Sequence, residues 1–159
     1  MLASKLLGVC VRYTKNREEA EDCLQEAFIK IFQNITTYKN EGSFEGWARK
    51  ITVNILLDFL KSRKSFQNSF DVQDVENYIP DKSETHGNLL KQDVVSIINM
   101  LPDGKKTIFN LYAVEGFSHK EIAEMLKISE GTSKSQLSKA KEMLIELHKK
   151  HNAIANVAS

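Results

Sequence analysis

Apolar residues recur every three or four positions along most of the chain, which is the spacing of helices that bury one face. This pattern predicts helices that span 2–14, 17–35, 44–64, 89–100, 102–114, 119–126 and 130–150. Among the side chains expected to face inward are Phe28, Phe32, Val94, Ile108 and Tyr112. Runs of alternating β-branched residues, which would indicate strands, are absent, so the predicted fold class is all-α.

The last two predicted helices are separated by a tight turn. Ser118 is an N-cap candidate, and Glu121 stands three residues later, where its carboxylate can bond back to the cap. Ser129 can cap the second helix, and Lys127 stands in the turn where a left-handed glycine would fit most easily. Ser133 stands where an apolar residue would pack better. A short helix, a three-residue turn and a longer helix are typical of a DNA-binding helix-turn-helix.

The outward face of the second helix carries hydroxyl, amide and lysine side chains. These residues are Thr132, Lys134, Ser135, Gln136, Ser138, Lys139 and Lys141. In a major groove, such polar side chains would lie near base edges and the lysines near phosphates. Any two amphipathic helices of a bundle give a similar pattern, so DNA binding and plain helix packing both remain open from this pattern alone.

The length of 159 residues fits one moderate domain or two small ones. Segment 65–90 is polar, acidic and without apolar periodicity, which predicts a flexible linker between two small helical domains. We therefore expect one domain over 1–64, a second over 91–150 and a flexible tail over 151–159. The net charge is only +1, so any affinity for nucleic acid must come from local clusters of basic residues.

The candidate chemistry of the chain is limited. Cys10 and Cys23 lie among apolar neighbours and in no zinc-ligand spacing, so we expect core thiols in a reducing compartment. His119, His148 and His151 stand in no metal-ligand or catalytic spacing, and we expect no catalytic site, no metal and no cofactor. No stretch is long enough to span a membrane, and the predicted location is the cytoplasm.

Two surfaces in the first domain have an unusual composition. One face of the helix over 17–35 is acidic and contains Glu18, Glu21, Asp22, Gln25 and Glu26. A solvated face explains this composition, and so does docking onto a basic partner. The helix over 44–64 and the loop before it place cations beside aromatic rings, as on surfaces that stack unpaired bases. These residues are Tyr38, Phe44, Trp47, Arg49 and Lys50, and a core position explains Trp47 as well.

Both halves of the chain match one family. The N-terminal half contains NREEAEDCLQEAFIKIFQNI followed by FEGWARKITVNILLDFLKSRK. The C-terminal half contains LPDGKKTIFNLYAVEGFSHKEIAEMLKISEGTSKSQLSKAKEML. In these segments and their order, the chain resembles alternative sigma factors of the extracytoplasmic-function (ECF) type, in the sigma-70 family. Members of this family are promoter-recognition subunits of bacterial RNA polymerase.

The resemblance implies a role for each surface. The part that docks on the polymerase clamp helices corresponds to the segment with Asp22, Gln25 and Glu26. The part that melts the −10 element and holds its non-template strand corresponds to the loop from Tyr38 to Gly42 and the helix with Trp47, Arg49, Lys50 and Asn54. The reader of the −35 element corresponds to Thr132, Lys134, Ser135, Gln136, Lys139 and Lys141.

The chain also departs from the family pattern. Gln136, Lys139 and Lys141 stand where the family usually has arginine. Lysine keeps the attraction to phosphate but lacks the bidentate geometry that arginine offers to guanine. The family's first helix normally begins upstream of Met1, which indicates a shortened N-terminus or an internal start.

The leading prediction is a sigma factor without catalytic activity that binds core RNA polymerase, recognises −10 and −35 promoter elements and initiates transcription. The resemblance also implies an anti-sigma protein as a regulatory partner. The alternative is a stand-alone helix-turn-helix regulator, which would bind duplex DNA without polymerase. A third hypothesis, an enzyme, has no metal pair, phosphate loop or nucleophile arrangement in the sequence to support it.

Overall fold

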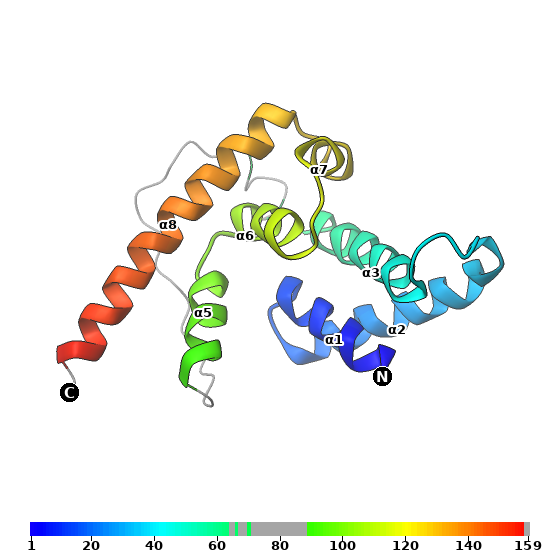
Figure 1. Ribbon diagram of the computed structural model, residues 1–159, viewed down its shortest axis with the longest axis horizontal. Helices are drawn as coiled ribbons and strands as arrows, with labels where there is room; N and C mark the ends of the chain where they lie inside the picture. The colour runs from blue at the N-terminus through cyan, green and yellow to red at the C-terminus, as the bar shows by residue number, and fades with distance from the viewer. Residues whose placement is uncertain (64–65, 67–69, 71–88, 158–159) are drawn as a thin grey trace. The chain divides into compact units, whose positions relative to one another are not determined.

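The computed structural model of the chain describes residues 1–63, 66, 70 and 89–157. The regular elements in these ranges are all helical, which confirms the predicted all-α class. The chain divides into two compact units, Met1–Lys64 and Ser65–Ser159 (Figure 1). The predicted linker over 65–90 lies almost entirely outside the described residues.

The first unit consists of three helices that pack against one another in pairs. They are α1 (Leu2–Tyr13), α2 (Arg17–Asn34) and α3 (Phe44–Lys61), with a short 3-10 helix, η1 (Ile35–Thr37), after α2. Asn16 caps α2 as predicted, because its Oδ1 accepts a hydrogen bond from the Glu19 backbone N–H at 2.9 Å. Ser43 caps α3 in the same way. The helix starts therefore follow from local side chains.

Each helix of the first unit contributes a side chain to one core. Leu6 of α1, Ile31 of α2 and Ala48 of α3 are buried together there. Cys10 and Cys23 are free and buried, which confirms the prediction of core thiols. Burial is also the main reason why the pKa is raised to about 12 for Cys10 and to about 11 for Cys23.

The second unit is built around one long helix. Its elements are α5 (Leu89–Asn99), α6 (Asp103–Phe109), the π-helix η2 (Asn110–Val114), α7 (His119–Leu126) and α8 (Glu130–Val157). The long helix α8 packs against α5, α6 and α7. The core of this unit contains buried Leu137 of α8 together with Ile108 of α6, Leu111 of η2 and Ile122 of α7. No glycine or proline interrupts α8 after Lys150, and the helix continues into the segment expected to be a tail.

Two apolar residues of this unit are exposed, contrary to prediction. Tyr112 is 40% exposed, because the backbone N–H of Glu115 bonds to the carbonyl of Asn110 at 2.9 Å and so widens the turn that contains it. The wider turn rotates Tyr112 out of the buried stripe. Val94 is 55% exposed on α5, whereas Ile97, three residues later and therefore turned to a different direction around the helix, is buried.

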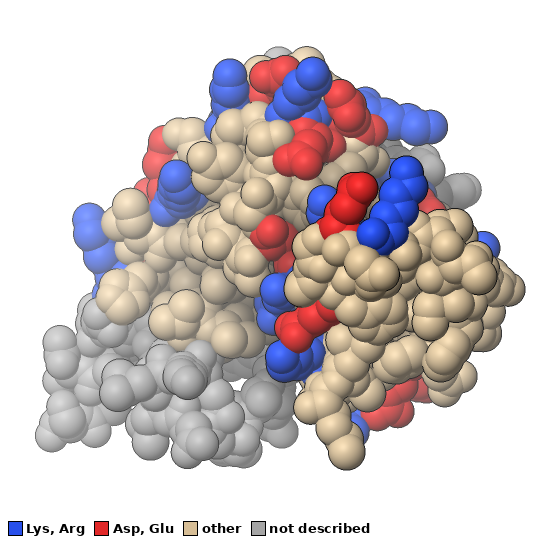
Figure 2. Space-filling model, turned by 45° about the vertical axis from the view of Figure 1, so that its right-hand side comes forward, with Lys and Arg blue, Asp and Glu red and all other residues tan. Residues whose placement is uncertain are grey.

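Charges of both signs are mixed on the surface. On the face that Figure 2 shows, basic and acidic side chains are interspersed, in line with the net charge of +1. Local arrangements of residues must therefore decide what each surface binds. None of the helices in the described part of the chain is long and apolar enough to cross a membrane.

Candidate functional site

Helices α7 and α8 form the predicted helix-turn-helix. Ser118 and Glu121 make the predicted capping box, in which Glu121 Oε2 accepts a hydrogen bond from the Ser118 backbone N–H at 2.8 Å. Lys127 adopts the left-handed conformation that the turn requires, with φ at 55°. Ser129 Oγ accepts a hydrogen bond from the backbone N–H of Thr132 at 2.9 Å and so caps α8. These local features of the motif match the sequence prediction.

The outward side of α8 carries fewer of the predicted DNA-binding residues than expected. Among them, Lys134, Ser135 and Lys141 are exposed, and Thr132 and Lys139 are half-buried. Gln136 is only 7% exposed, so its predicted place on the outward side was wrong. It follows Ser133 by three positions and precedes Ala140 by four, and this spacing places it on the packed side of the helix.

His119 has a contact that its spacing in the sequence did not predict. Its Nδ1 lies 2.9 Å from the Oγ of Ser133, which is fully buried. The two residues meet because the turn folds α7 back against α8. The available signal was Ser133 itself, since a polar residue at a position suited to an apolar one needs a hydrogen-bonding partner.

On α2, the three predicted docking residues Asp22, Gln25 and Glu26 are all exposed. Two exposed apolar side chains continue this side toward the end of the helix, Ile29 at 56% and Phe32 at 68%. Ile29 follows Gln25 by four residues, and Phe32 follows it by seven, so both lie on the same side. These five residues, called the α2 surface below, are polar and acidic at one end and apolar at the other.

Phe32 was expected to face inward, and that prediction was wrong. The inward side of α2 is occupied by small or branched residues that end at Ile31. Because one step along a helix turns a side chain by about 100°, Phe32 points away from the core. Its ring stacks on half-buried Phe28, with ring centroids 6.4 Å apart. Its spacing from Gln25 was the signal that could have placed it on the outward side.

Three of the predicted −10 residues share one side of α3. Trp47, Lys50 and Asn54 follow one another at intervals of three and four, with the last two exposed. Tyr38, in the loop before α3, lies against Trp47 with ring centroids 5.4 Å apart, and its hydroxyl donates to the Gly42 carbonyl at 2.8 Å. The loop and the helix thus form one surface with aromatic rings in it. Trp47 also packs against the core, which supports the core interpretation of this ring, and its contact with bases stays a prediction.

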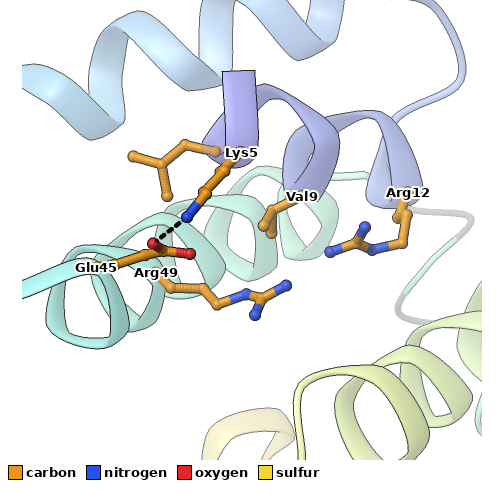
Figure 3. A pocket seen from close by; sticks show the side chains of 6 residues that line it. Lys5, Val9, Arg12, Glu45 and Arg49 are labelled. Carbon is orange, nitrogen blue, oxygen red and sulfur yellow. Dashed lines mark hydrogen bonds and ion pairs between the residues drawn. The ribbon is translucent and has the colours of Figure 1, made fainter. Parts of the chain in front are cut away.

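Arg49 lies apart from this surface. It lines a pocket of about 180 Å³ between α1 and α3 (Figure 3). The other lining residues are Lys5, Leu6, Val9, Arg12 and Glu45. Lys5 Nζ donates a hydrogen bond to Glu45 Oε2 at 2.6 Å, and this bond lowers the pKa of the Glu45 carboxyl. Arg49 and Lys50 are neighbours in sequence, but the helix turns them to different sides.

Comparisons with known proteins assign both units. The family model of sigma-70 region 2 matches residues 1–66, and that of sigma-70, region 4 matches residues 91–144. The ECF RNA polymerase sigma-E factor of Haemophilus influenzae is 30% identical over 152 residues, which cover 89% of this chain and 80% of that protein. The ECF RNA polymerase sigma factor SigE of Mycolicibacterium smegmatis is 28% identical over 95% of this chain, and the match spans 60% of that protein.

Solved structures share the fold at lower identity. The sigma factor RpoE from Bartonella quintana, in complex with the anti-sigma factor NepR, has a TM-score of 0.61 and 24% identity, and the match covers 93% of this chain and 92% of that one. The protein CnrH, in complex with the cytosolic domain of CnrY, has a TM-score of 0.53 and 18% identity, over 91% of this chain and 80% of that one. The Haemophilus relative, and the match of region 2 to the first unit and region 4 to the second, together show the family of this chain. This chain belongs to the ECF sigma factors of the sigma-70 family.

Proposed function

We propose that the chain is the specificity subunit that directs bacterial core RNA polymerase to a set of promoters and starts transcription there. The observation that carries this proposal is the match of region 2 to the first unit and of region 4 to the second, in one ECF sigma factor. In this scheme the chain works beside the polymerase in the cytoplasm. Catalysis belongs to the polymerase, and the chain supplies binding and positioning.

The α2 surface is the proposed contact with the polymerase. Protein interfaces typically combine a desolvated apolar centre with a polar rim. Ile29 and Phe32 supply apolar area, and Asp22, Gln25 and Glu26 supply polar and charged groups beside it. Adjacent large apolar side chains exposed on a surface typically mark an interaction site. A matching partner surface is basic, with an apolar depression for the Phe32 ring.

The side of α3 with Tyr38, Trp47, Lys50 and Asn54 is the proposed site for bases of the −10 element as they unstack. Aromatic rings offer stacking worth about 1–3 kcal/mol per base. Lys50 attracts phosphates, and the Asn54 amide can bond to a base edge. Arg49 stays a proposed DNA contact, but from the pocket between α1 and α3 it would reach a different stretch of the strand.

The outward side of α8 is the proposed reader of the −35 element. Lys134, Ser135 and Thr132 lie at the start of the helix, where side chains of a recognition helix meet base edges. Lys139 and Lys141 lie further along and are proposed to contact phosphates. Gln136 is buried and therefore supports the helix from its packed side instead of reading a base.

An anti-sigma protein is a further proposed partner. The sigma factor RpoE from Bartonella quintana, which shares the fold, was solved in complex with the anti-sigma factor NepR. A regulator that covered the α2 surface would block polymerase binding and would also remove two apolar side chains from water. This arrangement would keep the factor inactive until release.

In-vitro transcription tests the proposal. The purified full chain and core RNA polymerase are combined on a panel of genomic promoter fragments, and start sites are mapped. We expect transcripts from a subset of fragments only when both proteins are present. A chain that does not co-elute with core polymerase and yields no transcript would overturn the proposal. A gel shift of duplex DNA by the chain alone at low concentration would favour the stand-alone regulator.

A further inference from the structure

The packed side of the recognition helix contains a polar contact where an apolar one would be expected. Ser133, on α8, is fully buried on the side of the helix that faces α7. Its hydroxyl lies 2.9 Å from the Nδ1 of His119, the first residue of α7. A buried hydroxyl without a partner is costly, so this hydrogen bond favours the particular arrangement of α7 and α8 that allows it.

The imidazole of His119 is itself held by a second contact. Its ring stacks on the ring of Tyr112 in η2, with centroids 4.6 Å apart and planes 21° apart. The ammonium of Lys141, on α8, lies 6.0 Å from the centre of the same Tyr112 ring. The four residues Ser133, His119, Tyr112 and Lys141 thus link α8 to α7, α7 to η2 and η2 back to α8. We call this set the His119 clamp.

The clamp touches α8 at two separate points. Ser133 and Lys141 are eight residues apart, which corresponds to about 12 Å along the helix axis. A single contact would let the helix pivot, whereas two contacts at this separation restrain the direction of its axis. The contact at Ser133 lies at the end of α8 that carries Thr132, Lys134 and Ser135, the proposed readers of bases.

We propose that His119 is a positioning residue for −35 recognition, which through Ser133 sets the tilt of α8 against α7. The proposal rests on the proposed function of α8 as the reader. An apolar pair at these positions would pack over a range of angles, while a hydrogen bond weakens steeply outside a narrow range of distance and angle. The polar pair therefore selects one helix–helix angle, and base contacts depend on that angle in turn.

The experiment uses the full chain with core RNA polymerase and a promoter located by start-site mapping. Two templates share the −10 element, and one has a scrambled −35 element. The measured quantity is the ratio of transcripts from the intact and scrambled templates. The thermal midpoint of each variant is measured in parallel, because a merely structural contact would change the midpoint without changing the ratio selectively.

Ser133→Ala removes the hydroxyl that lies against His119 without adding volume to the buried site. We expect it to keep the thermal midpoint and to lower the template ratio by roughly five- to tenfold, the size of one lost base contact. His119→Ala should lower the ratio similarly, and the double variant should fall no further. His119→Asn, whose amide can place either an accepting oxygen or a donating nitrogen near the position of Nδ1, should keep the ratio within about twofold, as should Glu124→Ala on the exposed side of α7.

Two outcomes would overturn the clamp. One is a Ser133→Ala chain that folds, transcribes and keeps the ratio of the unmodified chain. The other is a pair of single variants whose effects on the ratio simply add in the double variant, since contacts that act together do not add. If the unmodified chain gives no transcript with core polymerase, the proposed function fails first and the role of the clamp fails with it.

Discussion

Reversing the charge of Asp22 should raise the stability of the chain slightly and weaken its binding to polymerase. Asp22 is exposed on α2 and makes no hydrogen bond or ion pair within the described part of the chain. Its neighbours four residues before and after it, Glu18 and Glu26, are both exposed and negative. Asp22→Lys therefore turns two repulsive helical pairs into two attractive ones, while it removes negative charge from the α2 surface.

The substitution should stabilise the helix and weaken polymerase binding, and the magnitude of each effect can be worked out. An attractive pair at this spacing stabilises a helix by about 0.2–0.5 kcal/mol, and a repulsive pair destabilises it by a similar amount. Replacing two repulsive pairs therefore gains about 1 kcal/mol after allowance for exposure and salt. In a unit of 64 residues this corresponds to a melting temperature higher by about 4–8 °C. Binding to a basic surface should weaken at least tenfold, about 1.4 kcal/mol, because attraction is replaced by repulsion.

Thermal melting followed by circular dichroism and a competition assay for core polymerase measure the two quantities. Glu146→Lys, on the exposed side of α8, is the control because it changes the charge of the chain by the same amount and belongs to the second unit, whereas α2 belongs to the first. The control should bind polymerase like the unmodified chain. An Asp22→Lys chain that melts at the same or a higher temperature and still competes equally for polymerase would refute the docking assignment of α2.

Three further predictions concern the turn, the thiols and the exposed ring. Lys127→Gly should raise the free energy of unfolding by up to about 1 kcal/mol in urea titrations, because glycine adopts a φ of 55° without steric cost; an unchanged value would contradict strain at the turn. Stability should fall as the pH rises above the ordinary thiol pKa of 9.0, because the unfolded chain ionises Cys10 and Cys23 while the native chain keeps them protonated. At about pH 10 the free energy of unfolding should be lower by about 1 kcal/mol per thiol, and a variant with alanine at both positions should not show this loss. An equal loss in that variant would exclude thiol ionisation as the cause. Phe32→Ala should change the free energy of unfolding by less than about 0.5 kcal/mol and weaken polymerase binding at least tenfold, whereas unchanged binding would exclude the ring from the interface.

Helix positions and caps could be predicted from the sequence because both are local. Asn16, Ser43, Ser118 and Ser129 each bond to a backbone N–H three residues later, and the distance between these groups is fixed by the helix itself. The left-handed conformation of Lys127 follows from the length of the turn in the same way. Such features need no knowledge of what the helix packs against.

The misplaced residues depend on packing or on partners. Periodicity identifies an apolar side but does not show which apolar residues are left for another molecule, so Phe32 was placed inside. Tyr112 is turned outward by a π-helix that the spacing of residues does not reveal. Gln136 is polar yet buried, so a rule that puts polar residues outside fails for it. Arg49 and Lys50 were grouped because they are adjacent, although a helix separates adjacent side chains.

In the proposed role of α8 as a reader of the −35 element, its composition would make its orientation important for promoter choice. Gln136 is buried, and Lys139 and Lys141 hold point charges that attract phosphate but do not form the bidentate bonds to guanine that arginine forms. Phosphate contacts supply affinity without sequence information, so in the proposed role of α8 discrimination at the −35 element would fall to a few side chains at the start of the helix. Short side chains such as that of Ser135 have little freedom to compensate for a misplaced backbone. On this proposal, a chain with few base contacts would depend more strongly on the angle of α8, which is the quantity that the contact between His119 and Ser133 is proposed to restrain.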